Sequence, residues 1–161
     1  MTAREAWNKT YDVNVTGTHV LTTAMAPLLI KGRNPRLLFL TSGLASQIEF
    51  ADPSTPRRQV PEAGWPKQSQ SFISYRTTKS ALNMLMLDWQ RLLEKDRVKV
   101  WSVSPGLLLT GLGNNPEFMR KIGAAHPSIG GEFIRDIVAG KRDADVGKVV
   151  RDYSSDKIQP W

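Results

Sequence analysis

Two short apolar runs flank a long stretch with helical periodicity, and this order constrains the fold more than any other feature. Residues 37–41 and 98–103 are rich in Leu, Val and aromatic side chains. Such runs are typical of strands buried on both faces of a parallel sheet. Between them, residues 72–95 repeat apolar side chains every three or four positions, which predicts an amphipathic helix. The order strand, helix, strand predicts a right-handed βαβ unit and an α/β fold.

Further regular elements are predicted on either side of this unit. Residues 2–31 carry a mixed apolar stripe that indicates a helix. Their start, Thr2-x-x-Glu5, is typical of a capping box. The apolar patterns toward the other end of the chain predict two short helices and a short strand, at 116–124, 131–139 and 149–151.

The bulk composition is typical of one globular domain, here residues 1–161. Of these residues, 40% are hydrophobic and 23% charged, as expected for a domain with its own core. There is no apolar run of about 18 residues, so no membrane span is expected. The absence of cysteine favours a cytoplasmic location. The net charge of +7 comes from scattered Lys and Arg, which argues against a nucleic-acid partner and favours a solvated basic surface. A site for a phosphate-bearing cofactor is compatible with this charge.

Residues 49–71 differ from the rest of the chain. They contain four prolines and Gly64, which predicts a long irregular loop insertion. Loops of this length are usually either functional or disordered. Two interpretations remain open, a lid that contacts substrate and a mobile surface insertion.

Tyr75 and Lys79 are predicted to lie in the first turns of the 72–95 helix. Residues four apart share a helix face, so the phenol and the ammonium can act on one small space. A nearby cation favours the phenolate and is expected to lower the pKa of Tyr75 from about 10. Tyr75 is therefore a candidate proton donor and acceptor. The alternative is a half-buried tyrosine beside a lysine whose stem covers apolar surface.

Four short patterns resemble, in the same order, the landmarks of the short-chain dehydrogenase/reductase family. Asn14-Val15-Thr16-Gly17 is similar to the N-x-x-G that precedes the catalytic strand. The strand that ends at Ser42 is similar to the strand carrying the catalytic serine. Tyr75 to Lys79 resembles Y-x-x-x-K, and residues 105–110 resemble P-G-x-x-x-T. The resemblance implies an incomplete Rossmann-type fold, a three-layer αβα arrangement with a parallel sheet.

The resemblance also implies a role for each matching residue. Tyr75 would be the catalytic acid and base, and Lys79 would lower its pKa; both would contact the ribose of the nicotinamide cofactor. Ser42 would bind the substrate oxygen, and Asn14 would hold a water that relays protons. The residues expected to contact the nicotinamide carboxamide are Pro105, Gly106, Leu108 and Thr110. Plainer alternatives are a turn for Ser42, a loop or cap for Thr110 and local bonding for Asn14.

The sequence departs from the family pattern in two places. It has no counterpart of the T-G-x-x-x-G-x-G turn that holds the pyrophosphate. The chain therefore resembles the carboxyl-terminal part of the family domain. Ser42 and Tyr75 are 33 positions apart, more than the family usually keeps, and the 49–71 insertion accounts for the excess. Without the preceding strands, we expect an open sheet edge and a first helix with no packing partner.

The function implied by the resemblance is hydride transfer between NADP or NAD and a carbonyl or alcohol substrate, such as a bulky hydrophobic metabolite. The alternative is an inactive remnant that acts by dimerisation or has no function. The helices at 2–31 and 72–95 occupy positions that commonly form the family's dimer interface, so they are the expected contact of a homo-oligomer. His19 and His126 lack paired ligand spacing, so no metal site is expected.

Overall fold

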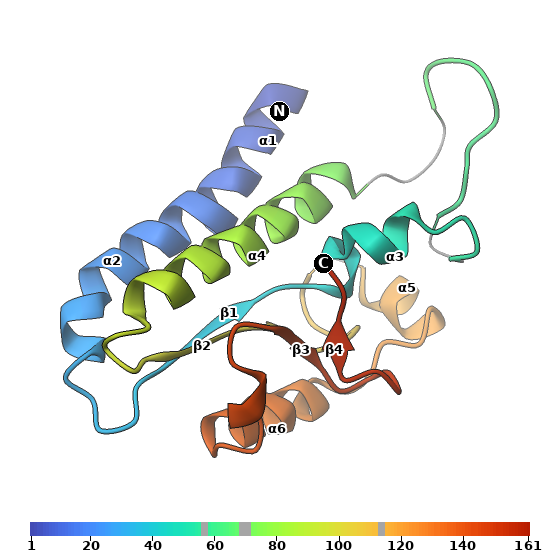
Figure 1. The fold of residues 1–161 in the computed structure, drawn as a ribbon. Coiled ribbons are helices and arrows are strands. Elements are labelled where there is room, and N and C mark those ends of the chain that lie inside the picture. The colour runs from blue at the N-terminus through green and yellow to red at the C-terminus, as the bar shows by residue number, and fades with distance from the viewer. Residues whose placement is uncertain (56–57, 68–71, 113–114) are drawn as a thin grey trace.

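A four-stranded sheet forms the centre of the structure (Figure 1), a computed structural model that describes residues 1–55, 58–67, 72–112 and 115–161. Strands β1, β2 and β3 are parallel, and β4 pairs antiparallel with β3 at one edge. The strand order is β1-β2-β3-β4. Their bounds are Arg36–Leu40 for β1, Lys99–Ser104 for β2, Val149–Arg151 for β3 and Ile158–Gln159 for β4.

Helices cover both faces of the sheet, so the predicted three-layer α/β arrangement is confirmed (Figure 1). One face carries α1 (Ala3–Tyr11), α2 (Gly17–Leu29) and α4 (Ile73–Leu93), and the other carries α6 (Pro127–Val138). Two short helices follow the carboxyl ends of β1 and β2, namely α3 (Gln47–Ala51) and α5 (Pro116–Lys121).

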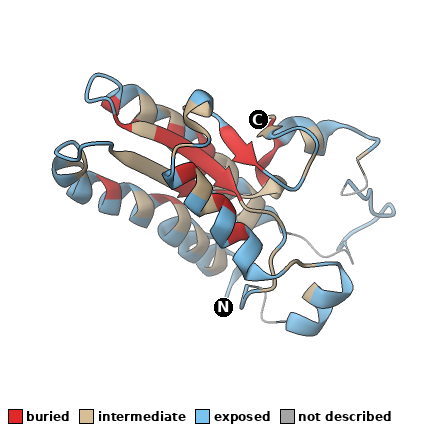
Figure 2. Ribbon diagram, turned by 90° about the horizontal axis from the view of Figure 1, so that it is seen from below, coloured by how far each residue is buried: buried red, intermediate tan, exposed pale blue. Residues whose placement is uncertain are grey.

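The crossover helix α4 packs its apolar stripe on the sheet. Met86 and Val100 are completely buried at the centre of this layer. The same cluster includes Phe39, Leu82, Trp89, Leu93 and Val98. A second cluster lies between the sheet and α6 and contains Trp101, Val103, Phe133, Ile137 and Val150. Figure 2 shows the buried residues concentrated on the strands and on the helix faces that meet them.

The predicted 2–31 helix is a continuous helical path interrupted by a π-helical segment, Asp12–Thr16, between α1 and α2. Its capping box is confirmed, because the Thr2 amide donates to Glu5 Oε2 at 2.7 Å and the Glu5 amide donates to Thr2 Oγ1 at 3.2 Å. The expectation that this helix lacks a packing partner is wrong. It lies along α4 over α1 and the π segment (Figure 1).

The open sheet edge is confirmed within the described residues, where β1 pairs with β2 alone. As a consequence, β1 is not buried on both faces as predicted, and Leu40 is 49% exposed. A cavity of about 370 Å³, here called the edge cavity, lies between β1, α2 and α4. Its walls are Asn14, Thr18, Leu21, Thr22, Met25, Leu37, Leu38, Phe39, Leu40, Lys79 and Leu82.

The segment predicted as an irregular loop, 49–71, begins with the end of α3 and has no regular structure from Asp52 to Pro66 where it is described. Residues 56–57 and 68–71 lie outside the described residues. None of the helices in the described part of the chain combines the length and apolarity needed to cross a membrane.

An ion cluster joins the amino ends of β1 and β2 to the segment after α6. Asp143 accepts two hydrogen bonds from the Arg36 guanidinium, at 2.5 and 3.0 Å, and one from Lys99 Nζ at 2.5 Å. The Arg36 side chain is 8% exposed, and that of Asp143 is 35% exposed. These bonds lower the pKa of Asp143 to about 2.

Asp143→Asn is expected to lower the free energy of unfolding near neutral pH by about 1–2 kcal/mol, since it leaves the buried Arg36 without its charged partner. The depressed pKa means that Asp143 stabilises the fold fully above its ordinary pKa of 3.8, and this stabilisation is lost as the pH falls toward about 2. Urea denaturation at pH 7 and at pH 3 measures both effects.

Asp88→Asn is the matched control, because Asp88 pairs with Arg91 on an exposed face of α4 and both side chains are more than half exposed. Its effect should stay below about 0.5 kcal/mol. An Asp143→Asn effect that is equally large at pH 3 and pH 7 would contradict the assignment to charge pairing.

Candidate active site

The loop that carries Ser42 continues directly from β1. The Thr41 amide extends the ladder by donating to the Val103 carbonyl at 2.9 Å. The chain then turns into a short 3-10 helix, Gly43–Ala45, whose N-cap is Ser42. Ser42 Oγ accepts a hydrogen bond from the Leu44 amide at 3.2 Å. The turn residue therefore sits at the carboxyl end of a strand, where ligands bind in open α/β sheets.

Three hydrogen bonds hold this loop against the first turns of α4. Lys79 Nζ donates to the Leu40 carbonyl at 2.7 Å, and Thr41 Oγ1 donates to the Lys79 carbonyl at 3.3 Å. On the other side of Ser42, Ser80 Oγ donates to the Ala45 carbonyl at 2.9 Å. The loop is thus attached to α4 before and after Ser42, which fixes the serine relative to the helix.

The side chain of Ser42 lies close enough to the Tyr75 hydroxyl to influence its pKa. Tyr75 is half-buried, and burial raises its pKa above the ordinary value, although the neighbouring Ser42 side chain offsets part of that rise. A phenol in this environment keeps its proton over the neutral range. The structure thus places a hydroxyl and a protonated phenol side by side at the end of β1.

The predicted lowering of the Tyr75 pKa by Lys79 is not what the structure shows. Lys79 Nζ lies 5.8 Å from the centroid of the Tyr75 ring, and its hydrogen bond goes to the Leu40 carbonyl. Burial of Tyr75 outweighs any attraction between the two groups. Burial also lowers the pKa of the Lys79 ammonium.

Asn14 lies in the π-helical segment and faces the same helix. Its Nδ2 donates to Thr78 Oγ1 at 3.0 Å, and Thr78 in turn donates to the Tyr75 carbonyl at 2.9 Å. Asn14 also lines the edge cavity together with Lys79. π-Helical turns within α-helices are frequent at functional sites, because the extra residue redirects a side chain.

The segment after β2 contains the other candidate residues. Pro105 and Gly106 follow the strand directly, and Gly106 has a φ of +92°, which a glycine adopts without strain. Leu108 pairs with Ala125 in a parallel bridge. Thr110 is exposed, and its Oγ1 accepts a hydrogen bond from the Leu112 amide at 3.3 Å.

Helix α6 approaches this segment closely at Gly130. A Cβ atom at Gly130 would lie 2.4 Å from Leu108 Cδ1 and 3.3 Å from Pro105 Cβ. A larger residue at position 130 would have to displace the Leu108 side chain. The segment therefore packs directly on α6.

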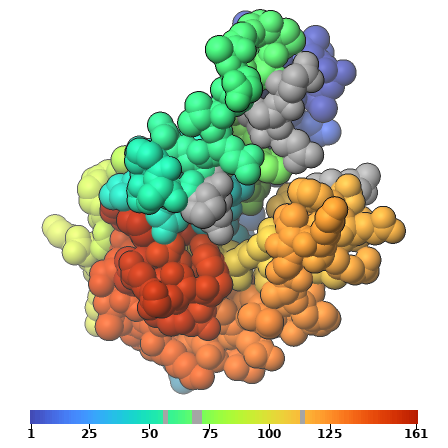
Figure 3. Space-filling view, turned by 90° about the vertical axis from the view of Figure 1, so that its right-hand side faces the viewer, coloured from blue at the N-terminus to red at the C-terminus, as the bar shows by residue number. Residues whose placement is uncertain are grey.

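Figure 3 shows the side of the molecule where the strands end. The α3 segment and the α5 segment stand on this side, with the carboxyl-terminal residues beside them. The structure brings Ser42, Tyr75 and Lys79 together and adds Asn14 through the edge cavity. Thr110 lies farther along its loop and is engaged locally.

Several residues that shape the site were missed from the sequence. Thr41 and Ser80 tie the Ser42 loop, and Thr78 links Asn14 to Tyr75. Helix α3 was missed as well, although Ser46-x-x-Glu49 carries the pattern of a helix start, and Ser46 Oγ does accept from the Glu49 amide at 3.1 Å. The partners of single hydroxyl groups leave no periodic signal in a sequence.

No protein-family model matches this chain. Curated proteins match it over nearly all of its length, two of them at 46% identity. The "short-chain dehydrogenase/reductase eupG" of a Phoma species is 46% identical over 170 residues, covering 100% of this chain and 60% of the relative. The "short-chain dehydrogenase/reductase tropE" of Talaromyces stipitatus is also 46% identical, over 98% of this chain and 59% of the relative.

The fold matches solved structures as well. The NADPH-bound carbonyl reductase from chicken fatty liver superposes with a TM-score of 0.69 at 17% identity, over all of this chain and 59% of that one. This match supports a Rossmann-type fold. The chain spans about three fifths of the length of the curated relatives it matches. By sequence and by fold, it belongs to the short-chain dehydrogenase/reductase family.

Proposed function

We propose that this chain supplies the catalytic residues of an NAD(P)-dependent oxidoreductase that transfers a hydride between a nicotinamide cofactor and a carbonyl or alcohol. The observation that carries the proposal is the cluster of Ser42, Tyr75 and Lys79 at the carboxyl end of β1. The names of the curated relatives agree with it. The substrate and the activity of this chain are part of the proposal.

The residues present fit the nicotinamide end of such a cofactor. An ammonium has three N–H donors, and the bond described for Lys79 Nζ, to the Leu40 carbonyl, uses one of them. The other two can reach hydroxyl groups of a ribose in the adjoining space. Tyr75 can contact the same ribose, and the backbone of Pro105 to Leu108, with Thr110, would face the carboxamide. When bound, the cofactor supplies the hydride.

We propose that the reaction runs as a carbonyl reduction at neutral pH. Because the pKa of Tyr75 is raised by burial, its phenol holds a proton that it can donate to the substrate oxygen. Ser42, whose side chain lies beside that of Tyr75, would donate to the same oxygen and orient it. Asn14 would hold a water for proton resupply. The chain's contribution is thus position and a proton.

The substrate we propose is a bulky hydrophobic carbonyl compound. Large apolar side chains are exposed on the segments next to Ser42 and Tyr75, namely Ile48, Phe50 and Phe72. Exposed apolar side chains beside a polar cluster are typical of ligand sites. We also propose that a second copy binds along α2 and α4, which expose Val20, Leu28, Met84 and Leu92.

Lys79→Ala is expected to weaken the binding of NADPH and NADH at least about tenfold, since one charge-assisted hydrogen bond contributes about 1.5–3 kcal/mol. Nicotinamide fluorescence during titration of the purified chain measures the affinity. Lys95→Ala, an exposed lysine in the turn after α4, is the matched control and should change nothing. A well-folded parent chain that binds neither cofactor would favour the inactive remnant instead.

Tyr75→Phe is expected to lower the rate of ketone reduction by about 10²–10⁴-fold, because it removes the proton donor and little else. The parent chain should keep its reductase rate up to the ordinary tyrosine pKa of 10.0 and lose it above, since a raised pKa delays loss of the phenol proton. Initial rates with a bulky aromatic ketone over pH 6–11 measure both.

Tyr11→Phe serves as the control for this variant, because Tyr11 is 44% exposed on α1. Its rate should equal that of the parent chain. If Tyr75→Phe retained full activity, Tyr75 would not be the proton donor.

A further inference from the structure

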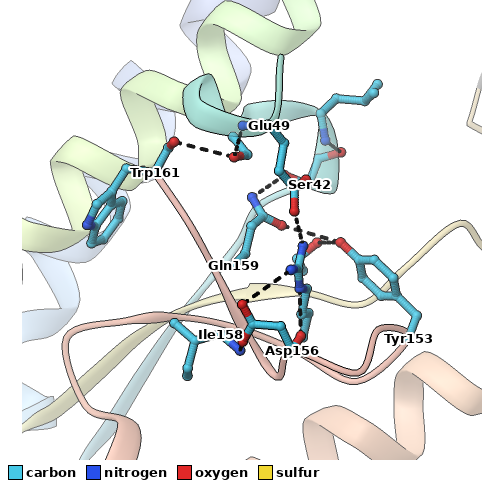
Figure 4. Close-up of polar contacts among 11 residues, drawn as sticks. Ser42, Glu49, Tyr153, Asp156, Ile158, Gln159 and Trp161 are labelled. Carbon is cyan, nitrogen blue, oxygen red and sulfur yellow. Dashed lines mark hydrogen bonds and ion pairs between the residues drawn. The ribbon is translucent and has the colours of Figure 1, made fainter. Parts of the chain in front are cut away.

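Polar contacts connect the carboxyl-terminal hairpin of β3 and β4 to the loops of the candidate active site (Figure 4). Its central residue is Gln159 on β4, which is 2% exposed. A buried amide needs partners for its donor and its acceptor. One partner belongs to the loop after β1, and the other contacts the loop after β2.

The first contact reaches the candidate catalytic serine. Gln159 Nε2 donates to the Ser42 carbonyl at 3.1 Å. The side chain of Ser42 starts from the same residue, whose φ of −151° and ψ of 150° set the direction of its Cα–Cβ bond. A bond that holds the carbonyl therefore also holds the Ser42 Cβ atom beside Tyr75.

The second contact reaches the loop after β2. The Tyr153 hydroxyl donates to Gln159 Oε1 at 3.3 Å and lies 2.9 Å from Ser104 Oγ. The Tyr153 ring covers Gly106, where a Cβ atom would lie 3.1 Å from Tyr153 Cδ1. The pair Gln159 and Tyr153 thus connects the Ser42 loop to the Pro105-Gly106 turn.

The orientation of the Gln159 amide follows from these partners. With Nε2 toward the Ser42 carbonyl and Oε1 toward the Tyr153 hydroxyl, both ends are satisfied. The opposite flip would set two acceptor oxygens face to face in a buried place. Only the donor end of an amide can hold the Ser42 carbonyl, so the side-chain type is specific.

The hairpin itself is firmly anchored. Arg151 on β3, with a side chain only 7% exposed, pairs with Glu49 of α3 at 2.5 Å and donates from Nε to the Asp156 carbonyl at 2.8 Å. The Trp161 carbonyl accepts from the Ile48 amide at 2.7 Å and from Ser46 Oγ at 3.3 Å. The support under Gln159 therefore extends into α3 on one side and into the sheet on the other.

We propose that Gln159 is a positioning residue, which holds the Ser42 carbonyl and, through Tyr153, sets the separation between the Ser42 loop and the Pro105-Gly106 turn. It acts through Ser42 and touches neither substrate nor cofactor. The proposal rests on the proposed function of Ser42 and deepens it. Displacements of about 1 Å in such a site can cost about a hundredfold in rate, so one buried amide is able to control activity from the sheet edge.

Gln159→Met tests the proposal, because methionine has similar length and no donor. The readout is the ¹³Cζ resonance of tyrosine in labelled protein, and the three tyrosines are Tyr11, Tyr75 and Tyr153. We expect the Tyr75 resonance to move in the same direction as in Ser42→Ala. In a Ser42→Ala background, Gln159→Met should move it no further, since the path runs through Ser42.

The controls separate positioning from general loosening of the fold. Tyr11, on α1, should stay unchanged in every variant, and Gln90→Met, on the opposite end of α4, should leave Tyr75 unchanged. If Gln159→Met moves only Tyr153, which it touches directly, the proposal is overturned. If Gln159→Met fails to fold, Tyr153→Phe decides: a Tyr75 shift in the Ser42→Ala direction supports the proposal, and an unchanged Tyr75 overturns it.

Turnover gives an independent readout that separates this proposal from the proposed function. In an active parent chain, Gln159→Met should lower kcat about tenfold or more. An unchanged kcat would count against positioning. A parent chain with no turnover would sink the proposed function, while the tyrosine resonances would still show whether Gln159 positions Ser42.

Discussion

Parallel pairing of β1 with β2 is the constraint on which the rest of the structure depends. Parallel neighbours cannot be joined by a tight turn, so the chain must cross back over the sheet, and α4 makes that crossing. The helix therefore starts where β1 ends. Ser42, just past the strand, and Tyr75, in the first turn of the helix, meet for this reason although they are 33 positions apart. The long segment between them can vary in length without disturbing that meeting, because loop closure entropy grows slowly with length.

Polar contacts then fix the positions of Ser42 and Tyr75 relative to each other. Backbone carbonyls of the Ser42 loop accept from side chains on α4 and β4, so both the helix and the sheet hold the loop. Burial has a chemical effect as well as a structural one. It keeps Tyr75 protonated and lowers the pKa of Lys79, and both effects follow from the loss of water around each group. The prediction from sequence assumed that Lys79 would lower the pKa of Tyr75. Burial has the larger effect on this pKa, because the Lys79 ammonium donates to the Leu40 carbonyl.

Much of the fold could be predicted from the sequence because its main elements are long or strongly apolar. The stripe of α4 and the run 149–151 gave correct elements, and α6 was expected only from 131, although it begins at Pro127. The π segment of the first helix was missed, since its backbone geometry comes from packing on α4. Strand β4 has two residues, too few for any periodicity. The structure brings Ser42, Tyr75 and Lys79 together as expected. The chemical roles assigned to these residues remain predictions. Gln159 was missed because its partner Ser42 lies 117 positions away.

The unpaired edge of β1 has a consequence for how this protein behaves at high concentration. Outward-facing peptide groups beside an apolar hollow form a template onto which a strand of another molecule can add. The net charge of +7 opposes such encounters through mutual repulsion. That repulsion acts over a distance of about 30 Å at 0.01 M salt but only about 8 Å at physiological ionic strength. Added salt is therefore expected to weaken the repulsion that opposes pairing of β1 edges between molecules.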